Sequence, residues 1–232
     1  MHRRLRPEAY GGLLEMQASH NRPYKLPLEL LPNSLVNRVR AYNQAQAGAE
    51  STLLLPMAFS SGSPLHPAYG AGHASVAGAC VTILKAWFDE DQTLASLFAK
   101  TQPRHPVSGS LVTLVRPDAE GSDVLPNLDA DVAGRLTVGG ELNKIASNVA
   151  MGRSMGGVHW RSDNTRSLRL GEIVATVMLR RQSRDYAEPG LTMTYRNFDG
   201  NRVTIDALGN VSVPEDLALE RFYMQEKFAP RG

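Results

Sequence analysis

The sequence predicts a mainly α-helical bundle that carries a small β-hairpin near its C-terminal end. Several long stretches have apolar residues three and four positions apart, which is the spacing of a helix with one buried face. One of these stretches, from about residue 73 to residue 88, is apolar nearly all round, as is typical of a helix inside a bundle. Close to the end, two segments with the alternating pattern of a β-strand flank the pair Asp199-Gly200, which is typical of a hairpin. With 232 residues, of which 42% are hydrophobic, the chain can form a sizeable core.

The N-terminal part is predicted to hold one helix between two irregular segments. Residues 9–25 contain glycine, asparagine and proline and few periodic apolar positions, so we expect a loop with at most one short turn of helix. Residues 26–47 follow helical spacing, with a start or break at Pro32. Residues 51–72 are interrupted by prolines and glycines, which predicts an extended, ordered loop.

Two helical segments and a long connection are expected next. The apolar helix over 73–88 includes Cys80, which we interpret as a packing residue. A second helical piece is predicted over 91–99. Residues 101–137, with proline, glycine and aspartate, form a connection of a length that is usually functional or covers a partner.

The C-terminal part is predicted to contain two more helices and the hairpin. Helical spacing runs over 141–155 and stops at a pair of glycines. Polar residues from Asp163 to Thr165 can cap a further helix that continues to about residue 186. The hairpin is expected over about 191–213, including a third strand at its end.

Composition excludes several functional classes. Lys and Arg outnumber Asp and Glu by 25 to 23, so the net charge of +2 provides no general attraction to nucleic acid or to acidic membranes. No apolar run approaches the roughly 18 residues of a spanning helix, so we expect no membrane insertion. A single cysteine excludes an intrachain disulfide framework. The first residues lack the apolar core of a signal peptide, and the cellular compartment stays open.

A first candidate for anion binding is the loop that leads into the apolar helix. Gly70, Ala71 and Gly72 are small enough to let the backbone approach a ligand. They precede the start of a helix, where free N–H groups and the helix dipole favour an anion. His73 stands at this start, and its imidazole can exchange a proton with a ligand oxygen near neutral pH.

A second candidate lies between the two helices of the C-terminal part. His159 follows a glycine pair in a tight loop, with Arg153 six residues before it and Asp163 four residues after it. An arginine offers a planar fork of donors to two oxygens of an anion. A carboxylate can orient the histidine through its second nitrogen. The combination predicts a pocket for a tetrahedral oxyanion such as phosphate or vanadate.

These two motifs together resemble a known family. His66-x6-His73 and Arg153-x5-His159-x3-Asp163 are similar to signature motifs of the vanadium-dependent haloperoxidases, which share their pocket with the type-2 phosphatidic acid phosphatase superfamily. The resemblance is strongest to the bromoperoxidase branch and continues through Gly140-Glu-Leu-Asn-Lys144 and the closing hairpin. It implies a helical bundle of the haloperoxidase and acid phosphatase type, formed by residues 1–232 as one vanadate-binding domain.

The resemblance also implies a cofactor and its ligands. The cofactor would be vanadate, with His159 as the residue that ligates vanadium. Arg6, Arg153 and the amide of Gly72 would neutralise the vanadate oxygens, and His73 would be a further contact.

Catalytic roles come from the same resemblance. His73 would be the acid–base partner of the apical oxygen, and His66 would lie behind it, near the halide and peroxide. Asp163 would orient His159, and Arg153 would act with these residues.

The implied reaction is the oxidation of bromide or another halide by hydrogen peroxide to hypohalous acid, through a peroxovanadate. The partners implied are hydrogen peroxide and halide, with room for a small organic substrate, and assembly into a homo-oligomer. No nucleic-acid partner is expected.

Two departures from the family pattern affect these expectations. Ala71 stands where the family usually has serine, which removes one hydroxyl donor and about 0.5–1.5 kcal/mol. The family's first motif places a lysine several residues before Arg-Pro, and such a lysine would fall before Met1 when the motif is aligned on Arg6. We therefore expect this chain to be the C-terminal portion of a longer architecture, with exposed apolar surface and little peroxidase activity alone.

Other interpretations of the same residues stay open. An acid phosphatase would use His159 to attack phosphorus and His73 to protonate the leaving group. A structural remnant would only assemble with itself or with a partner. Three histidines and an aspartate could hold zinc, although the neighbouring arginine opposes a cation. The Gly70-x-Gly72 pair does not form a dinucleotide loop, because no strand is predicted before it.

Overall fold

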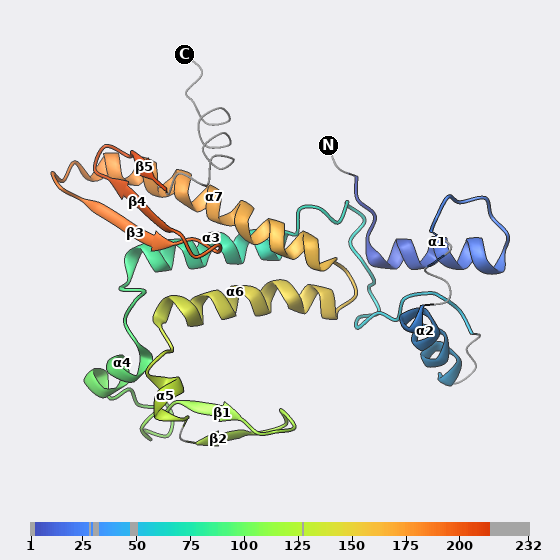
Figure 1. Cartoon of the computed structure of the whole chain (residues 1–232), viewed down its shortest axis with the longest axis horizontal. Coiled ribbons are helices and arrows are strands. Elements are labelled where there is room, and N and C mark those ends of the chain that lie inside the picture. Colours follow the sequence, from blue (N-terminus) through green and yellow to red (C-terminus); the bar gives the residue numbers. More distant parts are fainter. Residues whose placement is uncertain (1–2, 28, 30–32, 47–50, 127, 214–232) are drawn as a thin grey trace, which may run out of the picture. The chain divides into compact units, whose positions relative to one another are not determined.

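A computed structural model of the chain describes residues 3–27, 29, 33–46, 51–126 and 128–213 (Figure 1). These residues form two compact units. Unit 1 combines the part up to Gly78 with Ser147–Gly171, and unit 2 combines Ala79–Ala146 with the part from Glu172 onward. The longest helices, α3 (Gly72–Trp87), α6 (Val138–Met155) and α7 (Arg161–Tyr186), contribute residues to both units. The predicted fold class, mainly α with a small antiparallel sheet, is confirmed, whereas the single domain over 1–232 stays a prediction.

Unit 1 begins with a helix that the sequence analysis placed wrongly in a loop. Helix α1 covers Pro7–Ser19. Proline suits the first helical position, because its missing N–H has no partner there, and Glu8 in the first turn complements the helix dipole. A Cβ on Gly11 would lie 3.1 Å from the carbonyl oxygen of Leu53, so the helix packs closely against a segment distant in sequence. This packing stabilises a helix whose glycines weaken its apolar pattern.

The second helix of unit 1 is shorter than predicted. Helix α2 covers Ser34–Ala45, because the side chain of Asn33 accepts a hydrogen bond from the N–H of Leu35 at 2.9 Å and caps the helix there. Of the earlier residues in the predicted helix, 28 and 30–32 lie outside the described part, including the predicted break at Pro32. Residues 51–71 form no helix or strand, which confirms the predicted loop.

The remaining elements belong to unit 2. The predicted helix over 91–99 is α4, which covers Leu94–Thr101 and is capped by the Thr93 hydroxyl. The predicted connection contains elements of its own: an antiparallel pair, β1 (Val115–Pro117) and β2 (Val124–Pro126), and the short helix α5 (Ala130–Ala133). The hairpin prediction is confirmed by β3 (Thr192–Arg196), β4 (Arg202–Asp206) and β5 (Val211–Ser212).

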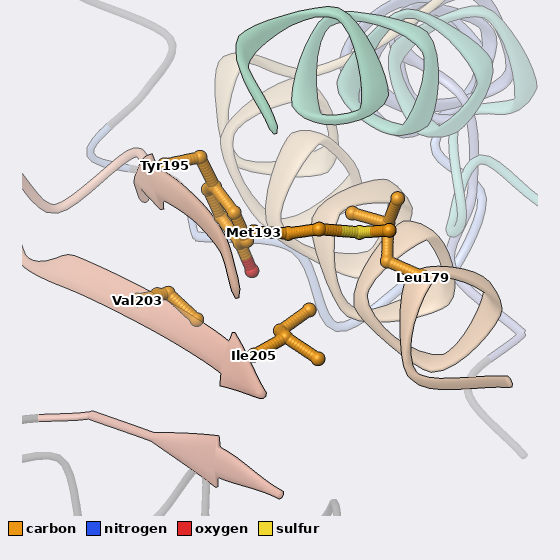
Figure 2. Packing of buried hydrophobic residues seen from close by; sticks show 5 residues of the cluster. All are labelled: Leu179, Met193, Tyr195, Val203 and Ile205. Carbon is orange, nitrogen blue, oxygen red and sulfur yellow. The ribbon is translucent and has the colours of Figure 1, made fainter. Parts of the chain in front are cut away.

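The core of unit 2 lies between the hairpin and α7 (Figure 2). Met193 pairs with Ile205 and Tyr195 pairs with Val203, so all four side chains project from one face of the sheet toward Leu179. The hydroxyl groups of Thr176 and Tyr195 lie 2.6 Å apart in this core.

A fully buried lysine also holds the hairpin. The ammonium of Lys85 in α3 donates to the carbonyl of Arg196 at 2.6 Å and lies 4.7 Å from the centre of the Phe198 ring. Burial lowers the pKa of Lys85, although the charges of Glu172 and Glu90 oppose this. The contacts satisfy a cation that would otherwise be costly to bury.

The predicted burial of helix 73–88 on all sides is wrong for this chain. Val76 and Trp87 in α3 are each 64% exposed, and Phe88 directly after the helix is 56% exposed. The described residues therefore leave apolar surface exposed, as expected from the sequence. None of the described helices is long and apolar enough to cross a membrane.

Candidate functional site

The candidate site lies within unit 1, where the chain turns from α6 into α7. Gly157 has a φ of +76°, a backbone conformation that side-chain-bearing residues rarely adopt. The turn is closed by a hydrogen bond from the N–H of Val158 to the carbonyl of Arg153 at 3.1 Å. His159 follows and is almost completely buried. The glycine pair therefore lets the chain reverse within a few residues and fixes His159 between the two helices.

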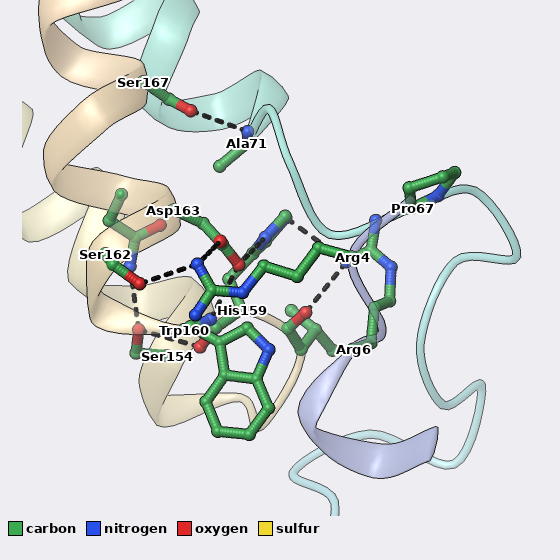
Figure 3. Close-up of polar contacts among 12 residues, drawn as sticks. Arg4, Arg6, Pro67, Ala71, Ser154, His159, Trp160, Ser162, Asp163 and Ser167 are labelled. Carbon is green, nitrogen blue, oxygen red and sulfur yellow. Dashed lines mark hydrogen bonds and ion pairs between the residues drawn. The ribbon is translucent and has the colours of Figure 1, made fainter. Parts of the chain in front are cut away.

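The Asp163 side chain contacts the ring of His159 (Figure 3). The Asp163 side chain is fully buried, and its Oδ2 lies 3.4 Å from Nδ1 of His159. The same oxygen accepts the N–H of Trp160 at 3.0 Å, so the carboxylate also caps the first turn of α7. Because an ionised carboxylate can only accept, this geometry assigns a proton to Nδ1 and a lone pair to Nε2.

Arg6 brings the N-terminal segment onto this histidine. The residue is 4% exposed, and its Nη1 donates to the carbonyl of Val158 at 2.8 Å and lies 3.3 Å from Nε2 of His159. Its Nε donates to the carbonyl of His66 at 2.9 Å, and its Nη2 lies 3.3 Å from Nδ1 of the His66 ring. Arg6, His66, His159 and Asp163 thus form one chain of contacts within unit 1.

The electrostatics of this cluster favour an anion. Burial lowers the pKa of His159, and the charges of Arg6 and Arg153 lower it further against the raising effect of Asp163. Burial also lowers the pKa of Arg6, with a further contribution from Arg153. Two guanidinium groups therefore repel each other beside a neutral histidine whose Nε2 carries a lone pair.

One buried donor at the site has no partner. The Nε of Arg153 makes no hydrogen bond to any described residue, although it is buried. Buried donors are rarely left unpaired in folded proteins, because the lost hydrogen bonds to water are costly. A tetrahedral oxyanion between the two arginines would pair this donor and relieve their repulsion, so the residues present fit vanadate or phosphate.

The start of α3 is fixed near this site, but His73 is not joined to it by a described contact. The N–H of Ala71 donates to the Ser167 hydroxyl at 2.8 Å, which ties the loop to α7. Ala71 and Ala74 pack with Ala150 of α6. The side chain of His73 is exposed, and no side-chain hydrogen bond joins it to the described residues. A Cβ on Gly72 would meet nothing within 4 Å, so the roles of both residues stay predictions.

The structure adds supporting residues that sequence reasoning missed. Arg4, which the sequence analysis does not assign to the site, donates to Oδ1 of Asp163 at 3.0 Å and to the Ser162 hydroxyl at 2.9 Å. Ser154 donates to the carbonyl of His159 at 3.0 Å and accepts from the amide of Asn164 at 2.8 Å. No sequence signal could identify Arg4, since its contact with Asp163 spans 159 positions. The described residues contain no group of three or more His, Cys, Asp and Glu side chains that could hold a metal ion.

Comparison with known proteins places these observations in context. Residues 22–188 match a family model described as the VCPO second helical-bundle domain. The chain is 41% identical over 219 residues to a vanadium-dependent bromoperoxidase of Corallina pilulifera, covering 88% of this chain and 33% of that protein. It is 36% identical over 216 residues to a vanadium-dependent bromoperoxidase of Ascophyllum nodosum, covering 92% and 35% of the two chains.

A solved structure is similar in fold as well. The homohexameric structure of the second vanadate-dependent bromoperoxidase (AnII) from Ascophyllum nodosum matches with a TM-score of 0.72 and 33% identity. The match covers 90% of this chain and 36% of that chain. The chain thus spans about a third of the length of the relatives that it matches.

Proposed function

We propose that this chain, which belongs to the vanadium-dependent haloperoxidase family and resembles its bromoperoxidase branch, binds vanadate. With vanadate bound, it would support the oxidation of bromide by hydrogen peroxide. The observation that carries this proposal is the pair of arginines, Arg6 and Arg153, beside a buried histidine that a carboxylate orients. Vanadate, when bound, would supply a Lewis acid that activates peroxide toward attack by a halide.

Each residue of the site has a distinct proposed role. His159 offers the lone pair of Nε2 as the ligand to vanadium, while Asp163 keeps the proton on Nδ1. Arg6 and Arg153 hold negatively charged oxygens, and the unpaired Nε of Arg153 provides a free donor for this purpose. Since the two guanidinium groups flank the histidine, they favour its neutral form, which is the form that can bind a metal.

The start of α3 supplies the remaining proposed contacts. The Gly72 amide would donate to an oxygen of the anion, since the space that a Cβ on this glycine would occupy is open. His73 would accept and return a proton on the peroxide side. His66, whose ring faces Nη2 of Arg6, would help to hold that guanidinium in place.

The proposed substrates are hydrogen peroxide and a halide, and the proposed product is hypohalous acid. A homo-oligomeric assembly is proposed as well, because the similar solved structure is homohexameric.

Binding of orthovanadate is the direct test, because it does not depend on turnover. We expect orthovanadate to raise the melting temperature of the chain, since a ligand that binds only the folded state stabilises it. Arg153→Gln should weaken the affinity, measured by calorimetry, by roughly tenfold, which corresponds to one charge-assisted contact. Arg166→Gln is the matched control, because Arg166 is exposed on α7 and should leave the affinity unchanged.

Turnover separates the remaining alternatives. Bromide, peroxide and orthovanadate together should halogenate a dye, at the low rate that the sequence analysis expects of this chain alone. Hydrolysis of a chromogenic phosphate ester without vanadate would instead indicate an acid phosphatase. A stable oligomer whose melting temperature does not respond to millimolar orthovanadate would contradict the proposal and favour a structural remnant.

A further inference from the structure

Arg4 reaches the candidate site through Asp163. Its Nη1 donates to Oδ1 of Asp163 at 3.0 Å and to the Ser162 hydroxyl at 2.9 Å (Figure 3). Oδ2, the other oxygen of this carboxylate, faces the N–H of Trp160 and Nδ1 of His159. The two oxygens of one fully buried carboxylate thus have separate partners, and Arg4 holds the oxygen that does not face the histidine.

The contact between Asp163 and His159 is the longest of these contacts of the carboxylate. It measures 3.4 Å, whereas the contacts with the N–H of Trp160 and with Arg4 each measure 3.0 Å. A hydrogen bond weakens as it lengthens and loses alignment. Partners on both oxygens fix the plane of the carboxylate, because its rotation would break the bonds from Trp160 and Arg4 together. The weaker contact with His159 therefore depends on these two partners for its direction.

The backbone around Arg4 is held in place on two sides. The carbonyl of Arg4 accepts from the N–H of Ala68 at 2.9 Å. The carbonyl of Leu5 accepts from the indole Nε1 of Trp160 at 2.8 Å. The side chain of Arg4 thus starts from a fixed backbone, and little further chain entropy is lost when it pairs with Asp163.

The side chain of Arg4 is oriented as well. Its guanidinium lies 5.7 Å from the centre of the Trp160 ring, and the Tyr10 ring meets that indole edge-on at 5.8 Å. The Arg4 side chain is 44% exposed, and ion pairs of such side chains usually contribute little, because a long side chain must be immobilised. Here the indole and the Ser162 hydroxyl already immobilise it, so the pair with Asp163 can hold the carboxylate.

We propose that Arg4 is a positioning residue for the oxyanion: it orients Asp163, which keeps the proton of His159 on Nδ1 and leaves the lone pair of Nε2 for the anion. The role of Arg4 in orienting the histidine stands on these contacts alone, whereas its role in anion affinity rests on the proposed function. Removal of a group that orients a metal-binding histidine commonly weakens the affinity by roughly 10–100-fold. Arg6 and Arg153, by contrast, are proposed to contact the anion themselves.

The affinity for orthovanadate and for inorganic phosphate, measured by calorimetry without peroxide or halide, tests this role. Arg4→Gln should weaken both affinities by roughly tenfold, the lower end of the range for such groups. Arg3→Gln is the matched control, because it removes the same charge from the neighbouring residue, whose exposed side chain makes no hydrogen bond or ion pair to a described residue. High ionic strength screens the long-range effect of either charge, so Arg3→Gln should leave both affinities unchanged. Equal affinities of the two variants would overturn the proposal.

The position of the proton on His159 is a readout that a purely structural role of Arg4 would leave unchanged. In the chain without an anion, at a pH where the ring is neutral, the imidazole nitrogen resonances distinguish a nitrogen with a proton from one with a lone pair. His159→Gln identifies these resonances among the six histidines. The parent and Arg3→Gln should carry the proton on Nδ1, and Arg4→Gln should show a larger share of the form with the proton on Nε2. A lower melting temperature of Arg4→Gln, with the proton position and affinities of the parent, would assign Arg4 a structural role alone and overturn the proposal.

Arg4→Lys separates the contact with Asp163 from the shape of arginine. Because only Nη1 of Arg4 donates to described side chains, an ammonium group can replace it, and this variant should recover most of the vanadate affinity. An affinity as weak as that of Arg4→Gln would overturn the proposal. A parent chain that binds no vanadate at millimolar concentration would refute the proposed function and the role of Arg4 in affinity, and the proton position would still decide whether Arg4 orients His159.

Discussion

Replacing Asp163 by asparagine tests whether this carboxylate holds the candidate site together. Its oxygens accept from the backbone N–H of Trp160, from Nδ1 of His159 and from Nη1 of Arg4, and the side chain is fully buried. Asparagine keeps the shape but has one accepting oxygen, and its NH₂ group would face donors. The amide oxygen can replace Oδ2, which faces both Trp160 and His159, but the NH₂ group then faces the guanidinium of Arg4 where Oδ1 accepted from it.

The expected cost follows from the three contacts. A hydrogen bond to a charged acceptor contributes about 1.5–3 kcal/mol and one to a neutral acceptor about 0.5–1.5 kcal/mol, so the bonds from Trp160 and His159 should each weaken by about 1 kcal/mol. The pair with Arg4 adds at most about 1 kcal/mol, since the Arg4 side chain is 44% exposed and screened by water. We therefore expect Asp163→Asn to lower the free energy of unfolding by roughly 2–3 kcal/mol.

Urea denaturation at neutral pH, followed by circular dichroism, measures this difference. Asp185→Asn is the matched control, because Asp185 lies on the same helix and its exposed side chain makes no hydrogen bond to a described residue. The control should change the free energy of unfolding by less than about 0.5 kcal/mol. If Asp163→Asn were as stable as the control, the carboxylate would not organise this turn and the argument for an oriented His159 would fail.

Three further predictions concern packing and pH. Gly78→Ala should lower the free energy of unfolding by about 1–3 kcal/mol in thermal melts, because the added Cβ would collide with the Leu168 carbonyl. Gly152→Ala is the control and should not lower it, because a Cβ there meets no atom within 4 Å. Ile205→Ala should lower the free energy of unfolding by about 2–5 kcal/mol, since this side chain is fully buried in the hairpin core. A decrease below about 1 kcal/mol would contradict the burial of Ile205 in that core. Burial raises the pKa of Glu15, but its hydrogen bonds and nearby positive charges together lower it, so this carboxylate stabilises the fold above its ordinary pKa of 4.5. The stability advantage of the parent over Glu15→Gln should therefore be full at neutral pH and disappear as the pH falls below that value; an advantage independent of pH would refute this.

Local patterns in the sequence were enough to predict several elements. The hairpin over about 191–213 follows from strand alternation and an Asp-Gly turn, which act between neighbouring residues. The turn that holds His159 is local as well, because Gly157 and Asp163 lie within four residues of it. These features depend on interactions between residues close in sequence, and such interactions leave a recognisable spacing.

Helix α1 shows where local patterns fail. Its glycines and short apolar pattern predict a loop, yet Pro7–Ser19 is helical, because Gly11 permits close packing against Leu53. The burial of Lys85 could not be predicted either, since the carbonyl of Arg196 that accepts its hydrogen bond lies 111 positions away.

The sequence by itself determined the family, the helical fold, the hairpin and the pairing of His159 with Asp163, because each of these is encoded in residues only a few positions apart. Only the tertiary structure decided that Arg6 lies against His159, 153 positions away, and that Arg4 holds Asp163. It also decided that the guanidinium of Arg4 lies against the Trp160 ring. The physical reason is that contacts between distant segments depend on how whole elements pack, and no spacing along the chain records that packing.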